Sequence, residues 1–346
     1  MVRRSHRIRD VAEQAGMSSA TVDRVLHGRP GVSARAVRAV EAAVLELERQ
    51  QSQVRLSRRT LLVDVVLDAP GRFRDAVTAA TEEALTSVRP ATVRARFRTS
   101  EGASPGQLAA AVDEVGTAGR VSHGLVLKAP DDPAVAAAVR RAGGRGIPTV
   151  TLVTDVTDSE RVAYVGLDNA AAGATAAYLL SRLVGVGDGV VLATLSHRSF
   201  LGEQERFVAF VERLGTEDPA RRVVTVGDLH GDDAATERAV TEALDGGPRV
   251  AGVYSVGGGN AGIARALAAA GVGSVPFLAH DLDADNLALL RGGILTAVLH
   301  HDLRADLRGA LTQLLRAHRL LPGAPTSVPS APQVVTPWNV PPRLRG

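Results

Sequence analysis

The residues that could bind a polar ligand come directly after short apolar segments of the chain. Each segment has the length of a buried strand, and ligands of open parallel sheets bind at the carboxyl ends of the strands. Polar side chains gather at these positions, in the ranges 68–74, 128–132, 153–158, 168–169, 196–206, 255–260 and 280–283. Carboxylates and guanidinium groups can accept from and donate to hydroxyl groups, and Phe73, Phe200 or Tyr254 could cover an apolar face. The pattern predicts a binding site for a small polar molecule at this edge of the sheets.

A run of glycines suggests a second kind of chemistry. Gly257, Gly259 and Gly262 follow an apolar segment and begin an Ala-rich one, and Asp281 lies further along the chain. This spacing satisfies the dinucleotide fingerprint, in which glycines let the backbone approach a pyrophosphate and an acid binds the ribose. An NAD-dependent oxidoreductase is therefore one alternative function.

Other catalytic chemistries have little support. The chain contains no Cys, which excludes thiolate metal sites and cysteine nucleophiles and fits a reducing compartment. His300, His301 and Asp302 are adjacent, but no third ligand follows at a zinc-site spacing, and no Gly-x-Ser-x-Gly elbow occurs. We expect no metal, no cofactor and no enzymatic activity.

Positive charge is concentrated at the start of the chain. Residues 1–59 contain twelve Arg against six Asp and Glu, whereas the whole chain has a formal net charge of +3. Such a segment is expected where a protein meets a polyanion. No apolar run of signal-peptide or membrane-spanning length is present, so we expect a cytoplasmic protein without membrane contact.

Three short helices must position these Arg residues. Their apolar faces can close on each other as a helix-turn-helix with a supporting third helix. Gly16 is expected to end the first helix, and Ser18 and Ser33 to cap the next two. The expected helices are Ile8 to Ala15, Ser19 to Leu26 and Ala34 to Glu48. We assign 1–48 to this head and the polar, basic residues 49–60 to a linker.

From Leu61 onward, apolar strands alternate with Ala-rich helical stretches. Alternation of this kind is typical of parallel sheets covered by helices, and an aromatic content of 3% implies cores of Ala, Val and Leu. The strands are expected at 61–67, 93–98, 124–127, 149–152, 163–166, 190–194, 223–226, 252–256, 276–279 and 297–299. Ten strands exceed one doubly wound sheet, so the sequence predicts a two-lobed α/β sensor over 61–346.

The lobe boundaries follow from where the chain is expected to cross over. We place the crossovers near 162–167, 292–297 and 321–325, and expect a helix at about Leu303 to His318 to pack with residues 61–160. The Pro-rich end cannot be helical and is either a tail or extended chain running back between the lobes. Lobe 1 would comprise about 61–162 and 296–322, and lobe 2 about 166–292 and 325–340.

The head carries a specific family signature. It reads Ile8-Arg-Asp-Val-Ala-Glu-Gln-Ala-Gly-Met-Ser-Ser-Ala-Thr-Val-Asp-Arg-Val-Leu26 and closely resembles the signature of LacI/GalR-family repressors. The resemblance implies a recognition helix in the major groove and a sensor like the periplasmic binding proteins. It points Ser19, Ala20 and Arg24 towards base edges and Ser18 and Thr21 towards phosphates, with Arg24 the best reader of guanine. We include His27 in this set.

Two features depart from the family pattern. Asp23 stands where the family usually has Ser, and we expect its carboxylate to accept from a cytosine or to pair with an Arg. The linker lacks the usual Pro and Ala-x-x-Leu, so Leu56 is the only candidate for the side chain that family members wedge into the minor groove. We include Arg55 and Leu56 in the DNA-binding set, and predict phosphate contacts from Arg55, Arg58 and Arg59 and a mild DNA bend without wedging.

The same resemblance assigns residues to the sensor cleft. Asn169 follows the crossover into the second lobe, Arg206 stands where an Arg reaches sugar hydroxyls, and Asp281 ends a strand that carries a sugar-binding Asp. His301 falls where a ligand-contacting Gln often stands. With the strand-end positions added, the predicted ligand-binding residues are Phe73, Asp155, Asn169, Arg206, Ser255, Asp281 and His301.

The resemblance implies a regulator, most simply a repressor. A homodimer, or a tetramer, would bind palindromic double-stranded operator DNA, and a sugar-like effector would change its operator affinity by closing the cleft. A transport-type sugar-binding protein is the other alternative to an oxidoreductase, and the DNA-binding head counts against it.

Overall fold

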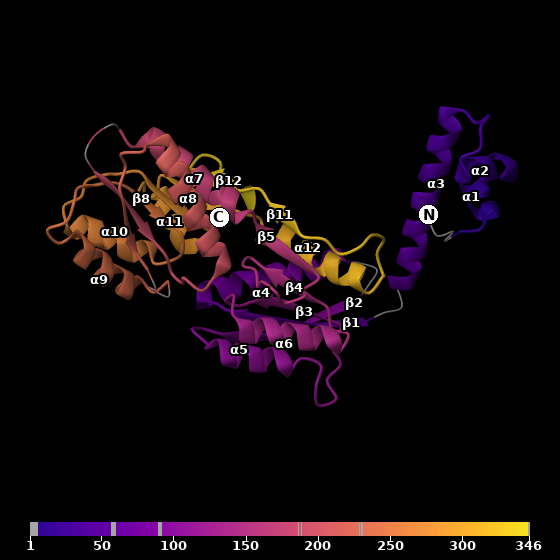
Figure 1. The fold of residues 1–346 in the computed structure, drawn as a ribbon, viewed down its shortest axis with the longest axis horizontal. Coiled ribbons are helices and arrows are strands. Elements are labelled where there is room, and N and C mark those ends of the chain that lie inside the picture. Colours follow the sequence, from indigo (N-terminus) through magenta and orange to yellow (C-terminus); the bar gives the residue numbers. More distant parts are fainter. Residues whose placement is uncertain are drawn as a thin grey trace.

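The computed structural model describes residues 6–56, 60–88, 92–185, 187, 189–227, 229 and 231–344. Three helices form a head, and two α/β lobes follow it (Figure 1). The head helices are α1 (Ile8–Ala15), α2 (Ser19–Leu26) and α3 (Ala34–Leu56). The predicted bounds of the first two helices are confirmed.

The head folds around a small aliphatic core and two local chain reversals. Gly16 adopts a left-handed conformation with φ 63° at the end of α1, where a side chain would be strained. The Ser18 hydroxyl caps α2 by accepting from the Thr21 N–H at 3.2 Å. The buried core residues come from all three helices and are Val11, Ala12, Val22, Val40 and Ala43.

Helix α3 continues to Leu56, beyond the predicted end at Glu48. Residues 49–56 contain no Gly or Pro, and Arg, Gln and Leu are good helix formers. Glu46 reinforces this turn by accepting from Arg49 at 2.9 Å and from Gln50 at 3.0 Å. The third helix therefore ends later than predicted and includes residues 49–56 of the predicted linker. The side chains of Arg55 and Leu56, and residues Arg58 and Arg59, lie outside the described part of the chain.

The first lobe contains a six-stranded sheet in the order β11-β5-β4-β3-β1-β2. The five pairs of adjacent strands in this sheet are all parallel. The strands are β1 (Thr60–Asp68), β2 (Thr92–Ser100), β3 (Gly124–Lys128), β4 (Thr149–Leu152), β5 (Ala163–Leu167) and β11 (Val328–Ser330).

The second lobe repeats this architecture in the order β12-β10-β9-β8-β6-β7. Its pairs are parallel except for β10 with β12, which is antiparallel. The strands are β6 (Val190–Thr194), β7 (Val223–Val226), β8 (Val250–Ser255), β9 (Phe277–His280), β10 (Ala297–His300) and β12 (Gln333–Val335). The predicted two-lobed fold with two doubly wound sheets is confirmed.

The chain crosses between the lobes later than predicted. The crossovers lie after β5, after β10 and between β11 and β12, because the strands at 163–167 and 297–300 each pair with the preceding strand before the chain leaves. Strand 297–300 therefore belongs to the second sheet and not to the first. Local apolar pattern could not show this, since both sheets bury equally apolar strands. The Pro-rich end runs back between the lobes, and Pro329 is tolerated because β11 is an edge strand.

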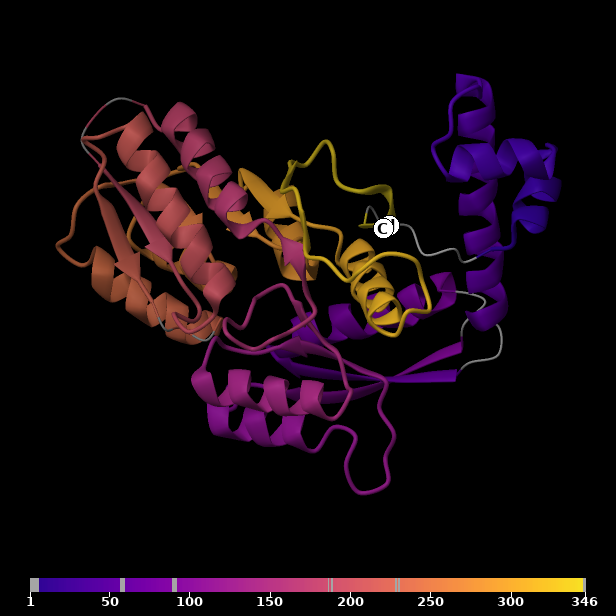
Figure 2. The same cartoon turned by 45° about the vertical axis from the view of Figure 1, so that its right-hand side comes forward.

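Helices cover both faces of each sheet (Figures 1 and 2). In the first lobe, α4 (Gly71–Ser87) and α12 (Leu303–Ala317) share one core, and α5 (Pro105–Asp113) and α6 (Pro133–Gly144) share the other. This confirms that the helix after residue 303 packs on the first lobe. In the second lobe, one core contains α7 (Asn169–Leu183) and α8 (Leu201–Glu217), and the other contains α9 (Asp233–Leu244), α10 (Asn260–Ala269) and α11 (Ala284–Arg291).

Helices α7 and α8 approach each other closely at Gly173. A Cβ at this position would lie 2.0 Å from the carbonyl oxygen of Arg206, which leaves room only for glycine. Gly215, near the end of α8, has no atom within 4 Å of its Cβ position. Packing at Gly173 therefore holds the α8 backbone that carries Arg206.

Replacing Gly173 with Ala should lower the free energy of unfolding by about 1–3 kcal/mol, because the added methyl group must push α8 away. The matched change Gly215→Ala should raise it by about 0.5–1 kcal/mol, since Ala favours helix and meets no neighbour there. Urea denaturation followed by circular dichroism measures both. Equal stability of the two variants would contradict the close approach.

Candidate functional site

A cleft of about 320 Å³ lies between the two lobes. Its wall takes Phe73 and Lys128 from the first lobe and Arg206, Asp281 and His301 from the second lobe and its crossover. The size falls within the range of roughly 300–1,000 Å³ that is typical of small-molecule sites. Phe73, Arg206, Asp281 and His301 thus lie together, as the sequence predicted, and their role in ligand binding remains a prediction.

Arg206 is the central buried cation of the cleft. Its Nε donates to the Asn169 side-chain oxygen at 2.8 Å, and its Nη1 donates to the Val256 carbonyl at 3.2 Å. Asn169 is itself buried behind the wall and donates to the Tyr164 hydroxyl at 3.2 Å. Asn169 therefore orients Arg206 and does not line the cleft.

His301 joins two buried carboxylates. Its Nε2 lies 3.3 Å from Asp281 and its Nδ1 contacts Asp306. Burial opposes a charge on the ring, but hydrogen bonds to both carboxylates raise the pKa of His301 to about 9. Burial would likewise raise the pKa of Asp281, but the hydrogen bond and charge of His301 hold it well below its usual value. The three groups form an imidazolium between two carboxylates, with Asp281 facing the cleft.

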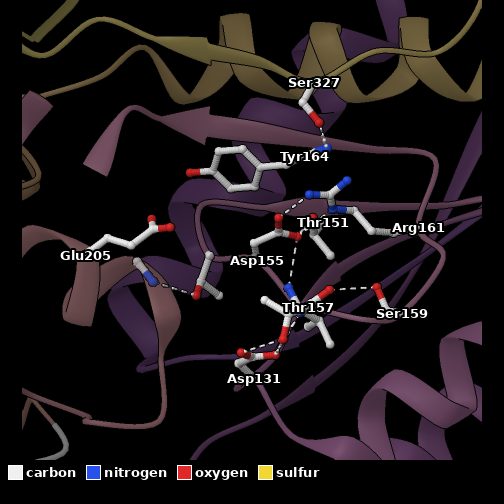
Figure 3. Close-up of polar contacts among 12 residues, drawn as sticks. Asp131, Thr151, Asp155, Thr157, Ser159, Arg161, Tyr164, Glu205 and Ser327 are labelled. Atoms are coloured by element: carbon white, nitrogen blue, oxygen red, sulfur yellow. Dashed lines mark hydrogen bonds and ion pairs between the residues drawn. The ribbon is translucent and has the colours of Figure 1, made fainter. Parts of the chain in front are cut away.

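Asp155 and Ser255 lie outside the cleft wall, although both follow strands. Asp155 accepts from the Thr151 hydroxyl and from Arg161 Nε, each at 2.6 Å, inside the loop that Figure 3 shows. Burial raises the pKa of Asp155, but these bonds outweigh it and lower the pKa overall. The Ser255 hydroxyl donates to the Gly257 carbonyl at 3.0 Å. Both side chains hold loops in place.

The cleft also contains ionisable residues that were not in the predicted set. Lys128 is buried at the carboxyl end of β3, and burial lowers its pKa to about 8. Glu203 accepts from the N–H groups of Ser196 at 2.8 Å and His197 at 3.1 Å. Lys128 begins the polar strand-end range 128–132 that the sequence indicated, although it was not among the predicted ligand-binding residues.

Three buried polar atoms of cleft residues lack a hydrogen-bond partner within the described residues. They are Asn260 Oδ1, His280 Nδ1 and His300 Nε2. The other side of the Asn260 amide donates to Asn286 at 2.7 Å, and His300 Nδ1 accepts from the Leu282 N–H at 3.3 Å. Because buried polar groups are usually paired, these three atoms point to a polar ligand.

The glycine run serves packing inside the second lobe. A Cβ at Gly257 would lie 2.6 Å from the Ser196 hydroxyl, one at Gly259 2.2 Å from Thr236, and one at Gly262 2.0 Å from a backbone oxygen of α9. Protein atoms therefore lie where a side chain at these positions would stand, so close packing requires glycine there. The fingerprint is explained by close contacts among helices and loops.

The lobes also touch each other directly around the cleft. The Gly202 N–H donates to the Thr154 hydroxyl at 3.2 Å, and the Asp131 N–H donates to the Ser199 carbonyl at 3.0 Å. On α4, Arg72 pairs with Asp283 at 3.2 Å. These contacts fix how the two walls face each other.

The recognition helix presents most of its predicted DNA-binding residues to solvent. Ser18, Ser19, Ala20, Arg24 and His27 are exposed, and Thr21 and Asp23 are half-buried. Asp23 pairs with Arg29 at 3.0 Å and with His27 at 2.9 Å. The carboxylate thus has an Arg partner, one of the two outcomes expected for it.

Comparison with known proteins agrees with this architecture. Residues 7–49 match the family model of bacterial regulatory proteins of the lacI family, and residues 65–317 match that of the periplasmic binding protein domain. The chain belongs to the periplasmic binding protein domain family over its sensor and carries a DNA-binding head of the lacI family. LacI-family regulators are not enzymes, so the oxidoreductase alternative is wrong, and the head separates this chain from transport-type binding proteins.

One curated relative is the HTH-type transcriptional regulator reg1 of Streptomyces lividans. It is 32% identical over 224 residues, which cover 64% of this chain and 62% of the relative. The match therefore spans less than two thirds of the relative's length.

Solved structures show the same sensor fold. A solute-binding protein from Burkholderia graminis, in complex with D-arabinose, matches with a TM-score of 0.73 and 22% identity over 81% of this chain and 96% of that chain. GanP, a glucose-galactose binding protein from Geobacillus stearothermophilus, matches with a TM-score of 0.72 and 17% identity over 82% and 100%. Within the described residues, no helix has the length and apolar character needed to cross a membrane.

The imidazolium of His301 makes stability depend on pH. Its pKa is raised from 6.5 in the unfolded chain to about 9, so its stabilising effect is complete below pH 6.5 and is lost as the pH rises through 9. Between these values the wild type should lose on the order of 2–3 kcal/mol relative to His301→Gln. Thermal unfolding at several pH values measures this difference. Lys128 is present in both proteins, so its titration cancels when the two pH curves are subtracted.

Asp306→Asn is the matched variant for this experiment. It removes one carboxylate from His301 and should shrink the pH-dependent loss without abolishing it. Parallel pH curves for wild type and His301→Gln would show that the ring carries no extra proton.

Proposed function

We propose that this LacI-family regulator is a repressor whose operator affinity is set by a sugar-like molecule bound in the cleft. The observation that carries the proposal is the cleft wall itself, where Arg206 and Asp281 stand beside the unpartnered atoms of Asn260 and His300. Donors and acceptors arranged in this way can pair with neighbouring hydroxyl groups and penalise an epimer that leaves them unmatched. The solved relatives that bind sugars in this fold support the choice of ligand.

The proposed mechanism is linkage between cleft and head. When the lobes close, the chain moves at all three crossovers at once. In a homodimer this movement changes the distance between the two recognition helices. A palindromic operator requires one particular spacing, because its half-sites repeat along the DNA helix. The ligand acts only through its different affinity for the two arrangements, which is worth roughly 1–3 kcal/mol in typical allosteric proteins.

Binding to DNA from upstream of the chain's own gene should change when the cleft is filled. We expect the full-length protein to shift this DNA in a gel and at least one pentose, hexose, uronate or polyol to change its affinity by about 5–150-fold. Thermal shift identifies the ligand first. No DNA binding under any condition would refute the regulator, and DNA binding indifferent to every bound ligand would refute the linkage.

Arg24→Ala should weaken operator binding by about 1–3 kcal/mol and relax the preference for guanine at one position, because the side chain is exposed on α2 and its planar fork fits guanine O6 and N7. Competition between operator variants and random DNA measures both effects.

Arg38→Ala on α3 is the control for general charge. Arg38 is exposed but lies outside the recognition helix, so its loss should affect operator and random DNA equally. If Arg24→Ala behaved in the same way, Arg24 would be a phosphate contact.

A further inference from the structure

The Lys128 ammonium lies between two aromatic rings, one from each lobe. Its Nζ is 3.8 Å from the centre of the Phe200 ring in the second lobe and 5.6 Å from that of Phe73 in the first. Both rings line the cleft. The aromatic faces that could stack on a sugar ring therefore hold a cation instead.

This cation has few partners inside the protein. Its Nζ donates to the backbone carbonyl of Asp68 at 2.9 Å, and no carboxylate within the described ranges forms an ion pair with it. The Asp68 carboxylate is used by the Ser100 hydroxyl at 2.8 Å and the Ala103 N–H at 3.1 Å. An ammonium has three N–H donors, so it has capacity left for acceptors from a ligand.

Burial lowers the pKa of Lys128, and among the carboxylates Glu203 has the largest effect in raising it. Its oxygens accept from Ser196 and His197 and do not reach Lys128. Asp281 is likewise bound to His301. A buried cation without a directly bonded anion is costly, and an anionic ligand group would remove that cost.

We propose that Lys128 binds a carboxylate of the effector, which makes the effector an acidic sugar of the uronate or aldonate class. This inference rests on the proposed function and names the ligand class of the same cleft. Arg206, Asp281 and Asn260 then face the hydroxyl groups of the ligand, while the Phe73 and Phe200 rings flank its acidic end.

A carboxylate fits this end of the cleft better than a phosphate. A phosphate dianion is usually held by several backbone N–H groups of a helix N-terminus together with Arg. The guanidinium beside Gly258 at the N-terminus of α10 is that of Arg72, and it is already paired with Asp283 at 3.2 Å and Asp285 at 3.5 Å. Lys128 offers one compact positive charge, which matches a single carboxylate.

Calorimetric titration of the full-length protein tests the proposal. The probes are D-glucuronate, D-galacturonate and D-gluconate, each compared with D-glucose or D-galactose, and D-glucose 6-phosphate as the phosphate arm. We expect at least one acid to bind about tenfold or more tightly than its neutral parent, as a charge-assisted hydrogen bond would provide. Lys128→Met should remove this preference, so that the acid and its neutral parent bind the variant with affinities within about threefold of each other.

Arg74→Met is the matched control, because Arg74 is a cation on the same helix as Phe73 but outside the cleft wall. It should keep the preference for the acid. Thermal unfolding and DNA binding of Lys128→Met verify that the variant is folded, and Lys128→Arg should keep most of the preference if Lys128→Met is unstable.

The outcomes separate this inference from the proposed function. Neutral sugars that bind as tightly as the acids, a tighter phosphate, or an acid preference that survives in Lys128→Met would each overturn the carboxylate assignment and leave a sugar-responsive regulator. Failure of every acid, phosphate, neutral sugar and polyol to bind would overturn both.

Discussion

A charged side chain that leaves water needs partners inside the protein, and five such groups meet where the two lobes face each other. Arg206 is held by Asn169, and His301 lies between Asp281 and Asp306. Lys128 rests on a carbonyl and two rings. These groups come from both lobes and a crossover. The position of each cleft wall therefore depends on contacts with charged or aromatic side chains from other elements. The same groups leave donors and acceptors that face the cleft.

Rigid packing carries this arrangement to the rest of the sensor. Gly173 lets α7 and α8 approach until the Arg206 backbone is fixed, and the hydroxyl of Thr154 binds the backbone at Gly202 across the lobes. The three crossovers are then the places where lobe closure can bend the chain. A ligand that draws the walls together must therefore move the first lobe relative to the second as a body, which is the motion that the proposed linkage to the head requires.

Short patterns in this chain have meanings that only their surroundings decide. The glycines at 257–262 satisfy the spacing of a dinucleotide site, yet Ser196, Thr236 and α9 fill the space beside them. Asp155 follows a strand as a ligand-binding residue would, yet Arg161 and Thr151 use its carboxylate. Glycine allows a ligand, a helix or a loop to approach its backbone closely, and a carboxylate pairs with the nearest donor. Residue type alone therefore does not identify the neighbouring group.

The sequence by itself determined the head and the class of the sensor. The helices of the head are set by local signals such as Gly16 and Ser18, and the sensor strands from β1 to β10 by apolar runs between Ala-rich helices. Tertiary structure alone decided which sheet receives strands 163–167 and 297–300, and that Lys128 is buried between aromatic rings. Strand pairing and the partners of buried charges depend on segments that are far apart in the chain. Local apolar periodicity does not predict which of these segments meet.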